Sequence, residues 1–223
     1  MIVEILTVFP NLFASVFSET ILHRALEQEL LTVHLVDLRG FARGGYVDDY
    51  PFSGGPGMVI KSQVVAEALA SLPADPRPFR VFLTPQGMRF TQAMARSLAG
   101  KDRLQLLCGR YEGVDQRVID DLFDLEVSLG DFVLSGGEIP AMAVVDAVTR
   151  LLPGALGNQA SVTEETFENT LLKGPVYTRP RTYADREVPA VLVDGNSKLQ
   201  KAWRREQEER CTRERRPDLL RKG

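Results

Sequence analysis

The chain has 223 residues, of which 44% are hydrophobic and 26% are charged, with a formal net charge of −3. This composition predicts a soluble globular protein with one large domain or a main domain and a small appendage. No apolar run reaches the roughly 20 residues of a membrane helix, and no basic-then-apolar leader begins the chain, so we expect a cytoplasmic protein without membrane association. Cys108, Cys211, His23 and His34 are scattered, which argues against disulfides and zinc and leaves only a hard cation on carboxylates as metal chemistry.

Strand and helix patterns alternate along the first 150 residues. In chain order they predict a strand at 2–9, a helix from 10 to 26, a strand at 31–38, a long glycine-rich segment without secondary structure at 40–57, a helix at 64–72, a strand at 79–84, a turn at 85–87, a helix at 91–98, a strand at 104–108, a helix at 114–123, a strand at 125–129 and a helix at 138–152. This alternation predicts an α/β fold, a parallel sheet with helices on both faces.

Glycine-rich turns follow three of the predicted strands, at 84–87, 108–113 and 128–137. Ligands of parallel sheets bind beyond the carboxyl ends of the strands, and glycine lets the backbone approach them closely. The sequence contains no dinucleotide fingerprint and no phosphate-binding loop of the Gly-Lys-Ser/Thr type. On spacing alone, a ligand pocket and ordinary connecting turns both remain open.

Charge is distributed unevenly. Residues 198–223 hold ten Lys or Arg and five Asp or Glu, so the rest of the chain is acidic. A basic end indicates either a nucleic-acid contact or a solvated helix with i,i+4 ion pairs, such as those available to Arg204, Arg205, Glu208 and Glu209. Charge alone favours the solvated helix. A polar stretch after Gly154 predicts a boundary, with domains at 1–156 and 173–223 joined by a linker at 157–172.

Several motifs, in order along nearly the whole chain, resemble the bacterial tRNA (guanine-N1)-methyltransferase family. They are Val47-Asp48-Asp49, Gly54-Gly55-Pro56-Gly57-Met58, Pro85-Gln86-Gly87, Cys108 to Gly113, Ser128 to Glu138, Tyr177-Thr178-Arg179-Pro180 and Arg215-Arg216-Pro217. The resemblance implies a SPOUT-type parallel sheet with a deep trefoil knot, a small mostly helical C-terminal domain and a homodimer whose active sites lie at the subunit interface.

The resemblance also implies S-adenosyl-L-methionine as the cofactor. The pocket residues that it implies are Phe82, Leu83, Thr84, Pro85, Gly109, Glu112, Ser128, Leu129, Gly130, Asp131, Phe132, Val133, Leu134, Gly136, Gly137 and Pro140.

The reaction implied is methylation of N1 of the guanosine immediately 3′ of the anticodon, when another guanosine precedes it. Glu165 stands where the family has the aspartate that removes the N1 proton. Arg150 matches the arginine that stabilises charge on guanine O6, and Asp48 and Arg110 match residues that shape the guanosine pocket. The C-terminal domain would bind the anticodon stem-loop, and Mg²⁺ would be held by carboxylates and tRNA phosphates.

Two alternatives remain at this level. One is a tRNA ribose 2′-O methyltransferase of the same superfamily, which needs no carboxylate to deprotonate a base. The other is a tRNA-binding protein that has kept the fold without catalysis.

Overall fold

The computed structural model describes residues 1–52, 54–157, 166–167 and 171–220. The chain divides into two compact units, Met1–Gly157 and Asn158–Gly223. In the part of the chain that is described, no helix is long and apolar enough to cross a membrane.

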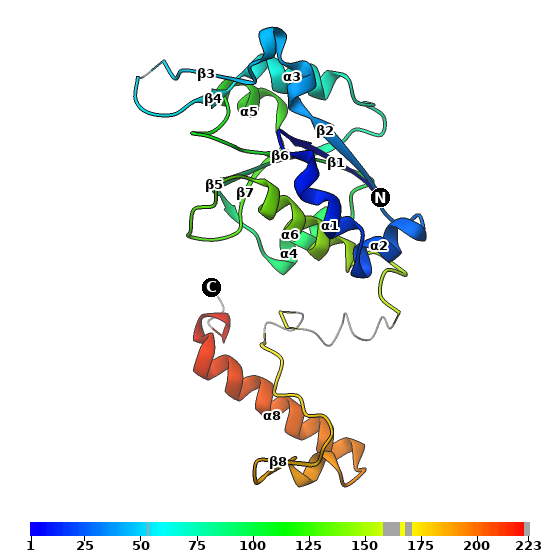
Figure 1. Cartoon of the computed structure of the whole chain (residues 1–223). Helices are drawn as coiled ribbons and strands as arrows, with labels where there is room; N and C mark the ends of the chain where they lie inside the picture. The colour runs from blue at the N-terminus through cyan, green and yellow to red at the C-terminus, as the bar shows by residue number, and fades with distance from the viewer. Residues whose placement is uncertain (53, 158–165, 168–170, 221–223) are drawn as a thin grey trace. The chain divides into compact units, whose positions relative to one another are not determined.

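A five-stranded parallel sheet forms the centre of the first unit (Figure 1). Its order is β2 (Thr32–Asp37), β1 (Ile2–Thr7), β6 (Arg103–Cys108), β5 (Phe79–Arg89) and β7 (Leu125–Ser128), and all neighbours pair in parallel. Every residue of the central strand β6 is buried. A strand covered on both faces needs no polar alternation, which explains the apolar run 104–108. The predicted α/β fold with a parallel sheet is confirmed.

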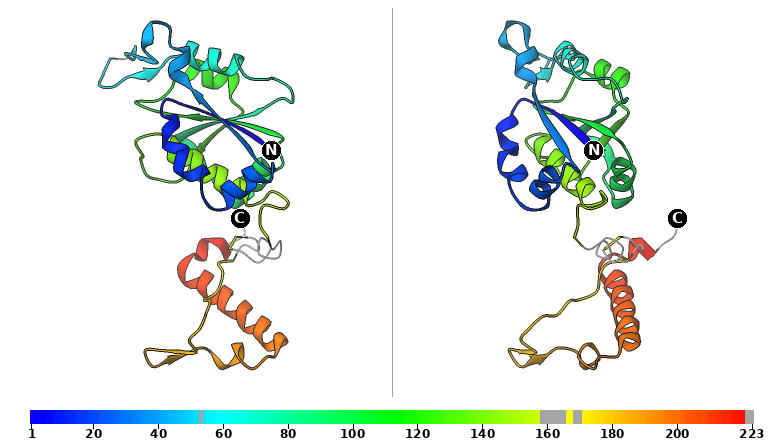
Figure 2. Two further views of the ribbon diagram at one scale, coloured as in Figure 1. Left: turned by 45° about the vertical axis from the view of Figure 1, so that its right-hand side comes forward. Right: turned by 90° about the vertical axis from the view of Figure 1, so that its right-hand side faces the viewer.

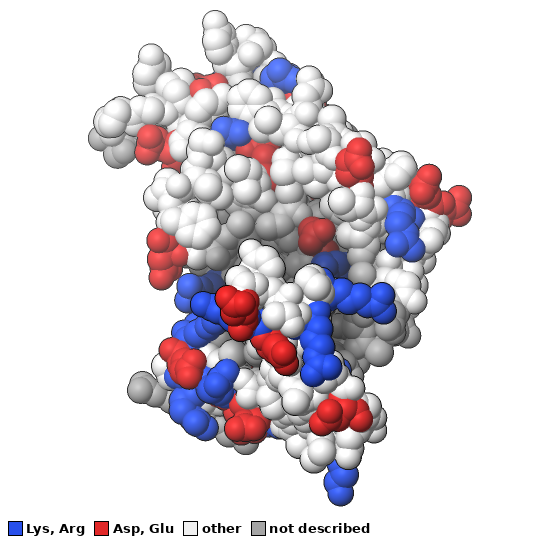
Figure 3. Space-filling view, turned by 60° about the horizontal axis from the view of Figure 1, so that its bottom comes forward, with Lys and Arg blue, Asp and Glu red and all other residues white. Residues whose placement is uncertain are grey.

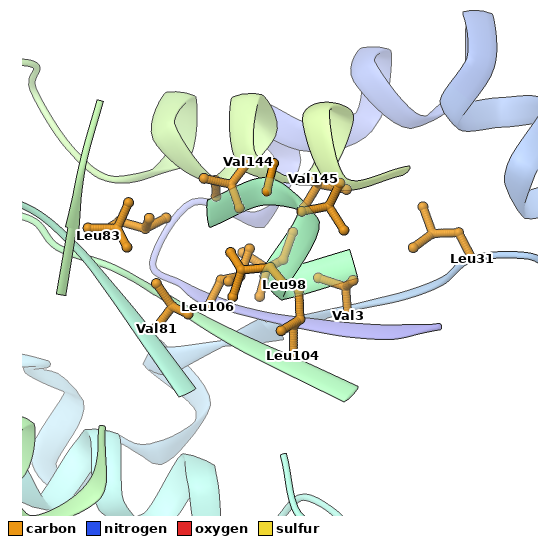
Figure 4. Packing of buried hydrophobic residues seen from close by; sticks show 14 of the residues in the cluster. Val3, Leu31, Val81, Leu83, Leu98, Leu104, Leu106, Val144 and Val145 are labelled. Atoms are coloured by element: carbon orange, nitrogen blue, oxygen red, sulfur yellow. The ribbon is translucent and has the colours of Figure 1, made fainter. Parts of the chain in front are cut away.

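Helices cover both faces of the sheet (Figures 1 and 2). One face carries α1 (Ala14–Phe17), α2 (Thr20–Glu27), α4 (Gln92–Ala99) and α6 (Glu138–Thr149), and the other carries α3 (Ser62–Ala70) and α5 (Gln116–Leu122). Successive strand residues point to opposite faces, so Val3 and Ile5 of β1 enter one core cluster and Leu6 enters the other. Figure 4 shows the first cluster, in which Val144 and Val145 of α6 lie against the strand residues.

The single helix expected from Pro10 to Leu26 is wrong. The structure has a 3₁₀ turn η1 (Pro10–Phe13), the short helix α1 and then α2, separated by a break at Ser18–Glu19. Thr20 has a φ of 62°, a conformation that side chains resist and that no continuous helix allows. The apolar spacing is nevertheless preserved, because Phe13 and Leu22 are buried and Phe17 and Leu26 pack against the same cluster.

The turn expected at Pro85–Gly87 is also wrong, because β5 continues through it to Arg89. The pairing with β7 shifts register between Leu83 and Met88, and then resumes as Met88 opposite Val127 and Arg89 opposite Ser128. Pro85 has no N–H to donate, which fits an irregularity in the ladder. Gly87 allows β5 to lie close to β7 again, because a Cβ at this position would overlap the backbone of Glu126 and Val127.

The segment 40–57 was expected to lack secondary structure, and this is wrong in part. It contains short 3₁₀ turns η2 (Leu38–Phe41) and η3 (Arg43–Gly45), followed by β3 (Asp48–Asp49). β3 pairs antiparallel with β4 (Val59–Ile60), which places Asp48 opposite Ile60. Ile60 is completely buried, so this small ribbon is anchored in the second core cluster.

The second unit is built around one long helix, α8 (Ser197–Arg215), which includes Trp203. It also holds the two-residue strands β8 (Thr182–Tyr183) and β9 (Arg186–Glu187), and the 3₁₀ turns η4 (Ala190–Leu192) and η5 (Pro217–Leu220). The Asn196 side chain caps α8 by accepting from the N–H groups of Lys198 and Leu199, each at 3.2 Å. Of the expected ion pairs, Arg205 and Glu209 form one at 2.9 Å. Most of the expected linker 157–172 lies outside the described residues.

Candidate cofactor pocket

A pocket of about 190 Å³ opens in the first unit where β5, β6 and β7 end. Three neighbouring strands supply it because the sheet order is β6-β5-β7. Its lining comes from the segments that follow these strands: Phe82, Leu83, Thr84, Pro85, Gln86, Gly109, Arg110, Tyr111, Glu112, Gly113, Val127, Ser128, Leu129, Gly130, Phe132, Val133, Leu134, Ser135, Gly136, Gly137 and Pro140. This is the sheet edge at which ligands of parallel α/β proteins bind.

The structure brings fifteen of the sixteen expected cofactor residues together in this pocket, and Asp131 is the one that does not line it. Arg110, expected as part of a guanosine pocket, lines it as well. The sequence reasoning missed Gln86, Tyr111, Gly113, Val127 and Ser135. All five adjoin expected residues in the chain, so contiguity with the glycine-rich turns was the signal that could have found them.

The pocket is lined mainly by backbone, glycine and apolar side chains. Arg110 and Glu112 are the two charged residues among those that line it. Glu112 also connects the pocket to the glycine-rich segment, because its N–H donates to Met58 O at 2.9 Å and its side chain fills the space where Gly57 would carry a Cβ. The close approach requires Gly57, whose φ is 88°.

Two segments that are distant in sequence, 108–110 and 135–138, meet at the pocket. The N–H of Gly137 donates to Gly109 O at 2.8 Å. A Cβ on Gly137 would lie 2.7 Å from Cys108 Cα, so only glycine permits this approach. The buried Cys108 thiol beside them has its pKa raised well above its usual value, first by burial and then by the Glu138 carboxylate. Cys108 is therefore a packed, protonated thiol and no nucleophile.

Asp48 lies near the pocket on the ribbon β3–β4. Burial and then the negative charge of Asp48 raise the pKa of the Tyr111 hydroxyl, while Arg110 opposes the shift. Tyr111 itself has a φ of 60°, and half of its surface remains exposed. Asp48 is therefore close enough to affect Tyr111, which lines the pocket together with Arg110.

The other two expected catalytic residues are not part of this pocket in the described chain. Arg150 caps the carboxyl end of α6, whereas Gly137 and Glu138 begin that helix at the pocket. Twelve helical residues separate these ends by about 18 Å, since each residue rises 1.5 Å. Glu165 lies outside the described residues. Nor do the described residues contain a cluster of three or more His, Cys, Asp or Glu side chains for a metal ion, so Mg²⁺ has no preformed site among them.

A second, larger groove of about 800 Å³ lies in the C-terminal unit, between residues 171–181 and α8. Its charged residues are Lys173, Arg179, Arg181, Lys201, Arg204, Arg205 and Glu208. Tyr177 and Trp203 form a ring contact in it, with centroids 6.2 Å apart. On the face of the molecule shown in Figure 3, Lys and Arg side chains are interspersed with Asp and Glu side chains. The groove itself holds six basic residues against one acidic residue.

The fold and the pocket define an α/β protein with a pocket lined largely by glycine-rich segments at the carboxyl edge of a parallel sheet, the edge at which proteins of this class bind small ligands. Comparison with known proteins identifies the family. Residues 1–222 match the family described as tRNA (Guanine-1)-methyltransferase TrmD.

Curated relatives are similar in sequence to almost the whole of this chain. Proteins named tRNA (guanine-N(1)-)-methyltransferase include one from Cereibacter sphaeroides, 50% identical over 98% of this chain and 90% of the relative. One from Moorella thermoacetica is 48% identical over 99% of this chain and 90% of the relative. One from Alkaliphilus oremlandii is 45% identical over 99% of this chain and 92% of the relative. The chain belongs to the TrmD family of tRNA (guanine-N1)-methyltransferases.

Proposed function

We propose that this protein transfers a methyl group from S-adenosyl-L-methionine to N1 of the guanosine immediately 3′ of the anticodon, in tRNAs where another guanosine precedes it. The observation that carries the proposal is the family match over residues 1–222. A tRNA substrate supports a cytoplasmic location, which is part of the proposal. Family membership does not favour ribose methylation or a non-catalytic tRNA-binding role.

The pocket fits an adenosyl group. Leu83, Val127 and Leu134 offer apolar surface for a base, and the glycine-rich segments that follow β6 and β7 let the backbone approach it closely. Ser128 stabilises the last of these turns, because its hydroxyl donates to Gly130 O at 3.1 Å and accepts from Gly130 N at 3.2 Å. When bound, the cofactor supplies an electrophilic methyl group.

The residues of the chain must accept one proton and stabilise one developing negative charge. Guanine N1 carries a proton at neutral pH, and it must lose that proton as it attacks. Glu165 acts as the general base that accepts it. Arg150 stabilises the negative charge that moves onto guanine O6, as a preorganised cation does for an oxyanion. Asp48 and Arg110 bind the base at the mouth of the pocket.

The distance of Arg150 from the pocket supports a homodimer. Within one chain Arg150 caps the end of α6 that is about 18 Å along the helix from its pocket end, which supports the inference that a second copy supplies this arginine. Phe132, Val133 and Ile139, on the segment that lines the pocket, are 54%, 84% and 56% exposed. Apolar surface of this kind commonly marks an interface.

The crossing of residues 108–110 and 135–138 supports the trefoil knot of the SPOUT fold. The chain that leaves β7 returns to pack against the segment that leaves β6, as the bond from Gly137 N to Gly109 O indicates. In the C-terminal unit, the basic groove beside Trp203 is the surface that we assign to the anticodon stem-loop. Lysine and arginine neutralise phosphates there, and exposed rings stack on unpaired bases.

The test is methyl transfer from labelled S-adenosyl-L-methionine to two unmodified tRNA transcripts, one with guanosine before the target guanosine and one with adenosine there. We expect product at guanine N1 in the first transcript alone. Arg150→Ala should lower kcat by about 10²–10³-fold, the usual effect of removing a group that stabilises an oxyanion, and calorimetry should find cofactor binding unchanged.

Arg24→Ala, on the exposed face of α2, is the matched control for Arg150→Ala and should leave kcat unchanged. Glu165→Gln should abolish the pH dependence that a general base imposes. Label on a ribose oxygen would contradict the proposal. So would tRNA binding by folded protein that neither binds the cofactor nor transfers methyl groups.

A further inference from the structure

Arg110 is held by the buried carboxylate of Glu138, a residue that was not among the expected site residues. The Nε of Arg110 donates to Glu138 Oε2 at 2.9 Å, and its NH1 donates to Ser135 O at 2.9 Å. Its guanidinium carbon lies 4.5 Å from the centre of the Phe9 ring. The Arg110 side chain is 17% exposed, whereas Glu138 is 1% exposed. The guanidinium therefore has a fixed orientation beside the pocket.

The other end of the carboxylate is anchored in the sheet. Glu138 Oε1 accepts from the Thr7 hydroxyl at 2.8 Å, at the last residue of β1. The same hydroxyl accepts from the N–H of Phe9 at 2.9 Å, so Thr7, Glu138, Arg110 and the Phe9 ring form one closed arrangement. Glu138 is also the first residue of α6, where the helix dipole favours a negative charge.

Local backbone is shaped around this contact. A Cβ on Gly136 would overlap the guanidinium of Arg110, so a glycine is required where the arginine passes. Arg110 has five N–H donors, and two of them have the partners named above. The other three have no hydrogen-bond partner among the described residues, on an arginine that lines the pocket. Glu138 and Ser135 O thus fix the guanidinium through Nε and NH1, and the second N–H of NH1 and both N–H groups of NH2 stay available to a ligand.

A second buried Glu–Arg pair shows that burial alone does not produce this arrangement. Glu4 Oε1 accepts from Arg103 NH1 at 3.2 Å, with the two side chains 2% and 7% exposed. Arg103 begins β6, at the end of that strand away from the pocket, and also donates to Pro73 O. The Glu4–Arg103 pair lies in the interior, whereas the arginine of the Glu138–Arg110 pair lines the pocket.

We propose that Glu138 is a positioning residue, which holds Arg110 so that its free N–H groups bind the O6 and N7 acceptors of the target guanine. An arginine fork matches these two acceptors, and adenine, which has an amino donor at the same place, does not. The inference rests on the proposed function, because it assumes that the target is guanine. It extends that function by naming the residue that sets the geometry of base recognition.

The experiment compares Glu138→Gln with Glu4→Gln, the same change in a buried Glu–Arg pair remote from the pocket. Wild-type transfer to the guanosine-guanosine transcript first establishes the activity, so failure of the proposed function is detected before any variant is judged. We expect Glu138→Gln to lower kcat/KM for tRNA by about 10–100-fold, the effect typical of misplacing a binding group by about an ångström. The dissociation constant of S-adenosyl-L-methionine should stay unchanged, and Glu4→Gln should retain wild-type kcat/KM.

A double-mutant cycle separates positioning from general stability. If Glu138 acts through Arg110, then Glu138→Gln should cause little further loss of kcat/KM in an Arg110→Lys background. Independent, multiplicative losses would overturn the proposal. An equal loss in Glu4→Gln would do the same, since it would mark a stability effect. A weakened cofactor affinity with unchanged kinetics for tRNA would also overturn it, because Arg110 would then bind the cofactor and not the base.

Discussion

Replacing Gly137 by alanine tests the crossing on which the pocket depends. Gly137 has a φ of −80° and a ψ of −3°, which alanine adopts readily, so the backbone itself does not oppose the change. The added Cβ would lie 2.7 Å from Cys108 Cα and 2.8 Å from Gly109 N, and both are backbone atoms that cannot rotate away. Relieving the overlap has to separate the two segments and weaken the bond from Gly137 N to Gly109 O. We expect a loss of about 1–3 kcal/mol in the free energy of unfolding, as for other overpacked interiors.

Gly100 provides a matched control at the end of α4. Its φ of −81° and ψ of 4° almost equal those of Gly137, but the closest atom to its Cβ would be Ser97 O at 3.6 Å. Gly100→Ala should be neutral or stabilising by about 0.4–1 kcal/mol, because it reduces the freedom of the unfolded chain. Urea unfolding and calorimetric titration with S-adenosyl-L-methionine measure both variants, and affinity should fall about tenfold, or 1.4 kcal/mol, in Gly137→Ala alone. Equal stabilities and equal affinities for the two variants would refute the close crossing.

Three further predictions follow from individual contacts. Thr91→Ala removes the side-chain cap of α4, a 3.2 Å bond from Met94 N, and should lower the unfolding free energy by about 1 kcal/mol without changing methyl transfer; an unchanged urea midpoint would argue against the cap. Ile139→Asp places a charge on a 56% exposed side chain in the first turn of α6, where the helix dipole tolerates an acid, and should convert the proposed dimer to monomer in sedimentation. A dimer that persists at micromolar protein would exclude this surface as the interface. Arg117 lowers the pKa of Asp115, so the stability that this carboxylate contributes is present above its ordinary pKa of about 3.9 and is lost as pH falls through the lowered value. The stability difference between wild type and Asp115→Asn should therefore be larger at neutral pH than in strong acid, and a difference that grows in acid would contradict the assignment.

Local pattern determined much of this protein. The apolar run 104–108 was enough to predict a buried strand, because a strand covered on both faces carries no polar alternation. The glycine-rich segments after the strands at 104 and 125 indicated the sheet edge at which a pocket could open, since parallel strands end at one edge of the sheet, although spacing alone did not distinguish a pocket from connecting turns. The motifs then indicated the family, which the matches over the chain confirmed. In each case the signal lies in neighbouring residues.

Only the tertiary structure decided which distant segments meet. Nothing near Glu138 in the sequence indicates that its carboxylate binds an arginine 28 residues earlier and a threonine in β1, or that Gly136 and Gly137 leave space for that crossing. The extension of β5 past Pro85 likewise depends on renewed pairing with β7, and the charge of Asp48 affects Tyr111 through space. The periodicity of apolar residues indicates on which side of its own helix or strand each residue lies. The contacts between elements are set by how all of them pack at once, because close packing and buried charge are satisfied only in three dimensions.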